Sequence, residues 1–262
     1  MLFAIDIGNS NIHIGFFQND KLKHSFSLST LTDRSVDEYK ITLKLLLNEY
    51  NCKIEDVNGV IIGSVVPSVT GKIKNAILSL TNAPIMIVGP GVKTGFHIKL
   101  DDPTQLGADL AANAAGALER VGHPAIIVDF GTATTVSAID NDKAYVGCYI
   151  MPGIQMSLDA LHSTELLPGV FADKAVPIIG KNSADSMRAG VVFGGIMAVE
   201  GFIEAYKREL NLPNDTPILV TGGYAHDIIC YFKPEIIYQE HLTLQGLNAI
   251  YKTNKAKKST KR

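Results

Sequence analysis

Two segments of the chain carry the same short pattern of chemically useful residues. In residues 3–10 and again in residues 127–134, an apolar run ends in Asp, and one apolar residue, a Gly and small hydroxyl or amide residues follow. In such a turn Gly lets backbone N–H groups approach phosphate oxygens, Ser, Thr or Asn adds donors, and the Asp can hold a cation or its water. The pattern therefore predicts two phosphate-binding turns, built around Asp6 and Asp129.

A simpler interpretation of each copy is a plain turn in which the Asp side chain accepts a backbone hydrogen bond. One copy alone fits both interpretations, and the repetition with matched flanks favours nucleotide phosphates. The sequence contains neither a Gly-x-x-x-x-Gly-Lys-Ser/Thr motif nor a Gly-x-Gly-x-x-Gly after the first apolar run. A P-loop and a dinucleotide-binding Rossmann domain are therefore not supported.

A third acid lies at the start of an Ala-rich segment, in the motif Gly107-Ala108-Asp109. If Asp109 faces a substrate, it could accept a proton from a hydroxyl during phosphoryl transfer. It could instead complement the positive end of its own helix, and spacing alone slightly favours this helix-end role.

Two further motifs each allow two interpretations. Gly222 and Gly223 follow an apolar run after Thr221, where they would let a base or ribose approach the backbone or simply form a strand–helix turn. Ser183 follows Asn182, and this pair first indicates a helix N-cap, with a substrate contact by the Ser183 hydroxyl as the alternative.

Alternating and helical apolar spacings predict an α/β protein of two similar halves with a cleft between them. Strands are expected at residues 1–7, 12–17, 21–28, 59–65 and 84–88, and again at 125–129, 135–139, 143–150, 218–221 and 236–238. Helices are expected at residues 36–50, 69–80, 104–121, 154–161, 183–210, from 225, and 244–251. The expected halves are residues 1–121 and 122–251.

The composition limits the classes of partner that the chain is expected to bind. The formal net charge of −2 over 262 residues provides no overall basic field for nucleic acid. Three scattered Cys form neither a disulfide framework nor a metal motif, and they favour a cytoplasmic location. The longest apolar stretches are too short for a membrane span. Residues 252–262 are basic and could be a nucleic-acid or membrane arm, but a disordered, solvated end is favoured.

Taken in order, the motifs resemble those of type III pantothenate kinase, a family of the acetate and sugar kinase/Hsp70/actin superfamily. The resemblance rests on Asp6-Ile7-Gly8-Asn9-Ser10, Ser64-Val65-Val66-Pro67, residues 89–95, Gly107-Ala108-Asp109, residues 129–135, Pro152-Gly153, residues 180–183, Thr221-Gly222-Gly223 and residues 242–247. It implies two ribonuclease H-like (actin-like ATPase) halves with mixed sheets. It also implies a homodimer that transfers the ATP γ-phosphoryl group to the terminal hydroxyl of pantothenate, with Mg²⁺ and a monovalent cation, K⁺ or NH4⁺. This is the first step of coenzyme A biosynthesis.

The resemblance also assigns residues. Positions that match ATP contacts are Asp6, Ile7, Gly8, Asn9, Ser10, Asn11, Ile12, His13, Thr132, Gly222 and Gly223. Positions that match substrate contacts are Leu100, Gly107, Ala108, Asp109, Leu110 and Ser183. Asp109 matches the general base, Asp129 a ligand of the monovalent cation, and Asp6 is a candidate for Mg²⁺ through the nucleotide.

Three positions depart from the family pattern. Leu110 stands where the family usually has Arg, Leu100 where it commonly has Tyr, and Ser183 where it usually has Thr. Ser183 keeps the hydroxyl, but Leu110 lacks the charged donors of Arg, each worth about 1.5–3 kcal/mol in a hydrogen bond. Two alternatives follow: a kinase of the same fold with another small hydroxylated acceptor, and a non-catalytic nucleotide-binding homologue.

Overall fold

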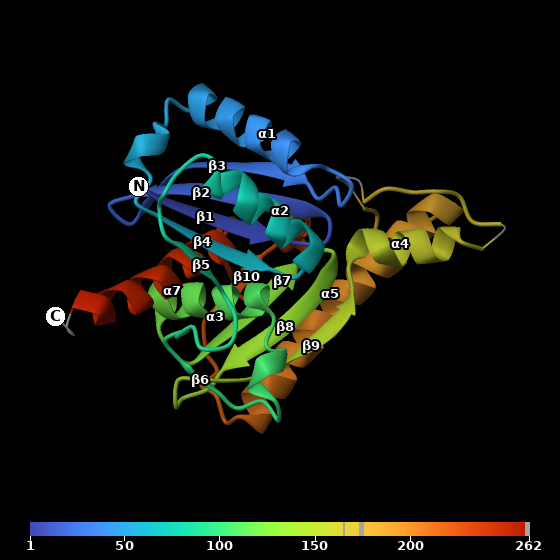
Figure 1. The fold of residues 1–262 in the computed structure, drawn as a ribbon. Coiled ribbons are helices and arrows are strands. Elements are labelled where there is room, and N and C mark those ends of the chain that lie inside the picture. The colour runs from blue at the N-terminus through green and yellow to red at the C-terminus, as the bar shows by residue number, and fades with distance from the viewer. Residues whose placement is uncertain (165, 173–175, 260–262) are drawn as a thin grey trace. The chain divides into compact units, whose positions relative to one another are not determined.

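The computed structural model describes residues 1–164, 166–172 and 176–259, with side chains described up to residue 255 (Figure 1). The chain divides into two compact units. The first unit contains residues 1–96, 101–119 and the segment from Leu242 onward, and the second contains residues 97–100 and 120–241. The expected division at residue 121 lies close to this boundary, but the expected second half differs because the closing helix belongs to the first unit.

The first unit is built on a five-stranded sheet in the order β3-β2-β1-β4-β5. Its strands are β1 (Leu2–Ile7), β2 (Asn11–Gln18), β3 (Lys21–Ser29), β4 (Gly59–Ser64) and β5 (Ile85–Ile87). The β1–β2 and β2–β3 pairs are antiparallel, whereas β4 runs parallel to both β1 and β5. The sheet is therefore mixed, with β1 at its centre.

The two faces of this sheet carry different helices because side chains alternate along a strand. Phe3, Ile5 and Ile7 pack in one core with α1 (Val36–Glu49) and α2 (Pro67–Leu78). Leu2 and Ala4 face the opposite side and pack with α3 (Ala108–Val121) and α7 (Leu242–Ser259). Figure 1 shows α1 and α2 on one side of the blue strands and α3 and α7 on the other.

The second unit repeats the strand order of the first. Its sheet runs β11-β10-β7-β8-β9-β6, so β9, β8, β7, β10 and β11 take the places of β3, β2, β1, β4 and β5. The strands are β6 (His97–Ile98), β7 (Ala125–Phe130), β8 (Ala133–Ile139), β9 (Ala144–Pro152), β10 (Ile218–Thr221) and β11 (Ile237–Tyr238). The pairings of β7–β8 and β8–β9 are antiparallel and those of β7–β10 and β10–β11 parallel, as in the first unit. The prediction of two similar α/β halves with mixed sheets is confirmed.

Among its described residues, the second unit also contains the helices α4 (Ile154–His162), α5 (Ser183–Glu209) and α6 (Ala225–Ile228). Short 3-10 turns lie at Ile54–Asp56, Pro103–Gln105 and Ile229–Tyr231. By length and composition α5 could cross a membrane, but this is weak evidence because core helices pass the same test. Val192, Ile196 and Val199 of α5 pack in the core of the second unit.

The sequence predicts a disordered tail from residue 252, and the structure differs from this prediction. Helix α7 continues to Ser259, and residues 260–262 lie outside the described part of the chain. Lys252 forms an ion pair with Glu119 of α3, and the Asn254 amide donates to the Lys93 carbonyl oxygen at 2.8 Å. These contacts with neighbouring segments extend the helix beyond the expected end at Tyr251.

Candidate functional site

In the first unit, Asp6 lies at the carboxyl end of β1, on the sheet face that carries α3 and α7. It shares this face with Leu2 and Ala4 because side chains alternate along the strand. Its neighbour on β2 is His13 and its neighbour on β4 is Gly63. Directly paired residues of neighbouring strands lie side by side on one face, so the three positions form a row across the end of the sheet.

The start of α3 lies close to this row, and Gly63 leaves space there for α7. A side chain on Gly63 would be in ordinary contact with the Ala108 methyl, at 3.7 Å, but would crowd the Leu247 side chain of α7, at 3.0 Å. The structure therefore brings the motif Gly107-Ala108-Asp109 to the strand ends that carry Asp6. Sequence reasoning missed Gly63, although a lone Gly inside an apolar strand signals a close approach.

The turn after β1 is fixed by hydrogen bonds within it and by Thr30, the residue that follows β3. The Gly8 N–H donates to the Asn11 carbonyl at 2.9 Å, and the Thr30 hydroxyl donates to the Gly8 carbonyl at 2.7 Å. The Thr30 N–H also donates to the Ser10 carbonyl at 2.9 Å. Asn9 and Ser10 are exposed at its tip. The turn is thus fixed by its ends while its tip faces solvent, an arrangement suited to an anion approaching the tip. The sequence motifs did not predict that Thr30 would fix this turn through hydrogen bonds to Gly8 and Ser10.

Asp109 is the second residue of α3 and is half-buried. One carboxylate oxygen accepts a hydrogen bond from the Leu110 N–H at 2.8 Å. A side chain on Gly107 would lie 2.6 Å from that oxygen, so glycine is required for the carboxylate to occupy this place. The helix-end role of Asp109 is therefore present in the structure, and the carboxylate is also held at one defined position.

Asp129 occupies the place in β7 that Asp6 has in β1. Its neighbours are Thr135 on β8 and Thr221 on β10. A side chain on Gly131 would approach the Asp129 carboxylate oxygen to 3.3 Å, and Thr132 at the tip of this turn is exposed. Both units thus present a half-buried Asp beside a Gly-containing turn, as the repeated pattern predicts.

The turn after β10 packs directly on the end of β7. Gly222 has a φ of +102°, and a side chain there would overlap the backbone of Phe130. The Tyr224 N–H donates to the Phe130 carbonyl at 3.2 Å. Gly223 is exposed, with open space where a side chain would lie. The structure therefore brings Gly222 and Gly223 next to the Asp129 turn, and Gly222 is needed for that contact.

Ser183 is the first residue of α5 and does not cap it. The Asn182 side chain caps the helix by accepting from the Asp185 N–H at 2.9 Å. The exposed Ser183 hydroxyl lines a hollow of about 590 Å³ together with Leu161, Leu167, Gly180 and Met187. Its hydroxyl is therefore available to a ligand in that hollow.

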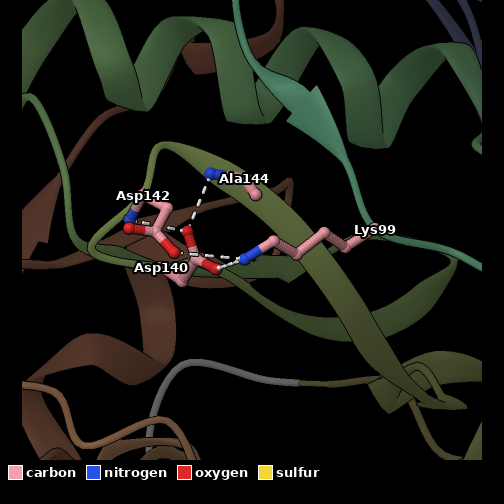
Figure 2. A network of polar contacts seen from close by, with 4 residues as sticks. All are labelled: Lys99, Asp140, Asp142 and Ala144. Carbon is pink, nitrogen blue, oxygen red and sulfur yellow. Dashed lines mark hydrogen bonds and ion pairs between the residues drawn. The ribbon is translucent and has the colours of Figure 1, made fainter.

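Leu100 follows a segment that is fastened to the second sheet. The Lys99 N–H donates to the Tyr145 carbonyl at 2.9 Å, and its ammonium contacts Asp140 at 2.7 Å and Asp142 at 3.3 Å. Figure 2 shows these side chains meeting at the turn between β8 and β9. This short strand, β6, was not predicted, because two paired residues are too few for a periodic signal.

Asp140 organises that turn. Its second oxygen accepts from the Asp142 and Ala144 N–H groups, both at 2.9 Å. Burial pushes the pKa of the Asp140 carboxyl up, but the hydrogen bonds from Lys99, Ala144 and Asp142 outweigh it and hold the pKa below its ordinary value of 3.8. The Lys99–Asp140 contact thus fixes the backbone immediately before Leu100.

We expect Asp140→Ala to lower the free energy of unfolding by about 1–3 kcal/mol, because it leaves two turn N–H groups without their acceptor. Since the folded-state pKa of Asp140 is depressed, the stabilisation by its ionised form is present above pH 3.8 and declines as the pH falls further. Urea unfolding of the wild-type chain and of Asp140→Ala between pH 3 and 7 measures this. A stability difference that grows on acidification would contradict the assignment.

The described residues contain no group of three or more His, Cys, Asp or Glu side chains that could hold a metal ion by themselves. A nucleotide-bound Mg²⁺ needs only one or two carboxylates, because phosphates and waters supply its other ligands. The half-buried carboxylates of Asp6 and Asp129 fit that requirement. A cation here would therefore be bound together with the nucleotide phosphates.

Comparison with solved structures supports the fold. A structure from Campylobacter jejuni, described as a candidate Baf family transcriptional activator, matches with a TM-score of 0.60 and 20% identity, over 97% of this chain and 99% of that one. Component A of (R)-2-hydroxyglutaryl-CoA dehydratase from Acidaminococcus fermentans matches with a TM-score of 0.55 and 12% identity, over 97% and 98%. At these identities the likeness shows a shared fold, which is the actin-like fold of two mixed-sheet units.

Comparison of sequences shows the family. A family model for type III pantothenate kinase matches residues 2–205. The type III pantothenate kinase of Geobacillus sp. (strain WCH70) is 39% identical over 259 residues, which cover 98% of this chain and 100% of that protein. That of Halalkalibacterium halodurans is 37% identical over 255 residues, which cover 97% and 100%. The chain therefore belongs to the type III pantothenate kinase family.

Proposed function

We propose that the protein transfers the γ-phosphoryl group of ATP to the terminal hydroxyl of pantothenate, forming 4′-phosphopantothenate in the first step of coenzyme A biosynthesis. The observation that carries this proposal is the full-length identity of 39% to a type III pantothenate kinase. The half-buried acids beside Gly-containing turns in both units support it, because phosphoryl transfer depends mainly on positioning and charge compensation.

In the proposed reaction the hydroxyl oxygen of pantothenate forms a bond to the γ-phosphorus. The bond from that phosphorus to the β,γ-bridging oxygen breaks, and ADP leaves. Asp109 accepts the hydroxyl proton, and Gly107 keeps the space that its carboxylate occupies. Leu100, Ala108, Leu110 and Ser183 are the other proposed substrate contacts.

The first unit contributes Asp6 and the turn from Ile7 to His13 as phosphate contacts. The second contributes Thr132 to the phosphates and Gly222 and Gly223 to the base or ribose. Asp129 is proposed to hold K⁺ or NH4⁺, and Asp6 to contact Mg²⁺ through the nucleotide. When bound, these cations would neutralise phosphate charge.

Release of ADP, followed with a coupled assay, tests the function. With pantothenate, ATP and Mg²⁺ we expect turnover that falls at least about tenfold when K⁺ is replaced by Na⁺, because a site whose oxygen ligands replace the hydration shell of K⁺ holds the smaller, more strongly hydrated Na⁺ less well. The Asp129→Asn variant should lose most of this K⁺ dependence. Turnover that is equal in K⁺ and Na⁺ would refute the role of Asp129, and no turnover with pantothenate would refute the acceptor.

A second candidate function is phosphorylation of another small hydroxylated acceptor, and Leu110 favours it. Leu110 adjoins Asp109 and is half-buried, but its side chain offers no donor to a carboxylate. The same ADP assay with a panel of hydroxylated carboxylates and amides separates the two candidates. A higher kcat/KM for any of them than for pantothenate would favour the second.

We also propose that two copies of the chain associate through the apolar side chains around α4 and α5. Leu166, Phe171, Ile178 and Ile179 are 93%, 75%, 71% and 71% exposed, and Met197 of α5 is 58% exposed. So many large apolar side chains in one region of a chain indicate an association surface. Light scattering should give twice the chain mass of 28.2 kDa, and Phe171→Glu should give the monomer mass.

A cytoplasmic location belongs to the same proposal. Cys52, Cys148 and Cys230 are all free thiols in the structure, as in proteins of reducing compartments. Pantothenate is the proposed partner of the site, with neither nucleic acid nor membrane required.

A further inference from the structure

The first unit contains a large pocket at the end of its sheet opposite the Asp6 turn. The pocket has a volume of about 710 Å³ and is lined by Leu2 at the start of β1, the β2–β3 turn, the segment after α1, and α7. The strand β1 rises about 3.3 Å per residue, so about 17 Å separates Leu2 from Ile7 at the phosphate-binding end. The pocket is therefore distinct from the candidate nucleotide turn.

The lining of the pocket is basic in a protein of net negative charge. Four lysines line it, namely Lys23, Lys53, Lys252 and Lys255, against the two carboxylates Asp20 and Asp56. Lys252 binds Glu119, and Lys255 lies 5.7 Å from the centre of the Tyr251 ring. Lys23 and Lys53 are exposed, and their ammonium groups form no hydrogen bond or ion pair with the described residues. Their charges are therefore available to an anion.

The floor of the pocket contains a polar side chain that makes no hydrogen bond to the described protein residues. Asn248 of α7 is only 4% exposed, lines the pocket, and makes no side-chain hydrogen bond with the described residues. Asn248 is not among the described side chains whose fully buried polar atoms lack a partner, and it lines the pocket. The Asn248 amide is therefore open to a ligand in the pocket.

Tyr251 adds a second polar group beside Asn248. It is 9% exposed, and its hydroxyl lies against the backbone of Gly59, where a side chain would overlap it. Burial raises the pKa of the Tyr251 phenol, so the group keeps its proton and can donate a hydrogen bond at neutral pH. The wall thus combines ammonium, amide and hydroxyl donors.

We propose that this pocket is a second binding site, for a small molecule that carries two or more phosphate groups. Lysine ammonium groups bind phosphate as point charges, whereas planar carboxylates are usually gripped by the fork of an arginine. The pocket lining contains lysines and no arginine among its residues. Its volume is sufficient for a molecule of nucleotide size.

Lysine acetylation read by mass spectrometry tests the site with inorganic pyrophosphate as the probe. In the full chain, pyrophosphate should slow acetylation of Lys23 and Lys53 about tenfold or more, because the bound anion engages their ammonium groups. Lys44 and Lys74, which are exposed on α1 and α2, should react at an unchanged rate. Equal protection of all four lysines, or of none, would overturn the proposal. This readout does not depend on any kinase activity.

Calorimetric titration with pyrophosphate at constant ionic strength gives the second test. Lys23→Ala/Lys53→Ala should weaken the affinity of this site about tenfold or more, whereas the matched control Lys44→Ala/Lys74→Ala should not. Asn248→Leu should also weaken binding, yet keep the melting temperature, because leucine fills a similar space and the Asn248 side chain makes no hydrogen bond to the described residues that could be lost. A wild-type titration curve from the Lys23/Lys53 variant, or a large loss of melting temperature in Asn248→Leu, would contradict the assignment.

Discussion

Asp109→Asn is expected to reduce phosphoryl transfer to pantothenate by about 100- to 10,000-fold, the range of rate that one general base supplies. Asparagine has the same shape and keeps an oxygen that can accept the Leu110 N–H, so the start of α3 should be preserved. It lacks the negative charge that accepts the hydroxyl proton. Steady-state ADP release should therefore show a loss in kcat, while ATP affinity measured by calorimetry stays within about twofold, since Asp109 is not among the proposed ATP contacts.

Asp101→Asn is the matched control for this prediction. Asp101 is an exposed acid in the segment before α3, eight positions earlier in the chain, and its substitution removes the same charge. It should leave kcat and KM unchanged. Full turnover in Asp109→Asn would remove the general-base role and leave Asp109 as a residue that completes the positive end of its helix, the role that its hydrogen bond to Leu110 already serves.

The repeated Asp-x-Gly pattern allowed the central part of the fold to be predicted. Each copy ends a buried central strand, and a strand of that kind requires neighbours on both sides, so two alternating series of strands and helices imply two similar sheets. The observed orders β3-β2-β1-β4-β5 and β9-β8-β7-β10-β11 confirm this. The prediction succeeded because it rested on long apolar runs with a repeated terminus.

Contacts between segments far apart in the sequence were not predictable in the same way. The sequence predicts a helix at residues 244–251, but nothing in that segment shows that the helix packs on α3, more than a hundred residues earlier. The same holds for Thr30, whose hydrogen bonds fix the Gly8 turn, and for Lys99, whose ion pair fastens β6. Each of these two contacts joins one side chain to a backbone group or to an acid. A contact of this kind produces no periodic pattern in the sequence.

For the candidate site, the sequence showed which residues could bind phosphate but not what holds them. Gly63, next to Asp6 on the neighbouring strand, leaves the space that Leu247 of α7 occupies. The interpretation of Ser183 as a cap was open, and the structure assigns the cap to Asn182. Roles of individual residues in binding ATP and pantothenate stay predictions, because they depend on ligands rather than on the fold.

Close contact between α3 and α7 leads to the second prediction, that Gly246→Ala lowers the free energy of unfolding by about 3 kcal/mol or more. A methyl on Gly246 would overlap the Ala112 carbonyl oxygen, and one on Gly116 would lie 2.7 Å from the Leu242 carbonyl oxygen. The two backbones therefore touch at this crossing, and the obstacle is backbone rather than a flexible side chain. Overpacking of this kind usually costs about 1–3 kcal/mol and more when neither partner can move.

Gly71→Ala in α2 is the matched control, because a methyl there meets no atom within 4 Å. It should raise stability by about 0.5–1 kcal/mol, since alanine has the higher helix propensity. Urea unfolding at pH 7 compares the two variants directly.

The crossing of α3 and α7 also affects activity, because Ala112 follows Asp109 by three residues. If the new methyl group displaces α3, the Asp109 carboxylate moves with it, and kcat should fall even where the variant remains folded. Equal stability of the two alanine variants would show that α7 can move away from α3 at no cost, and the close crossing would then have no part in positioning Asp109.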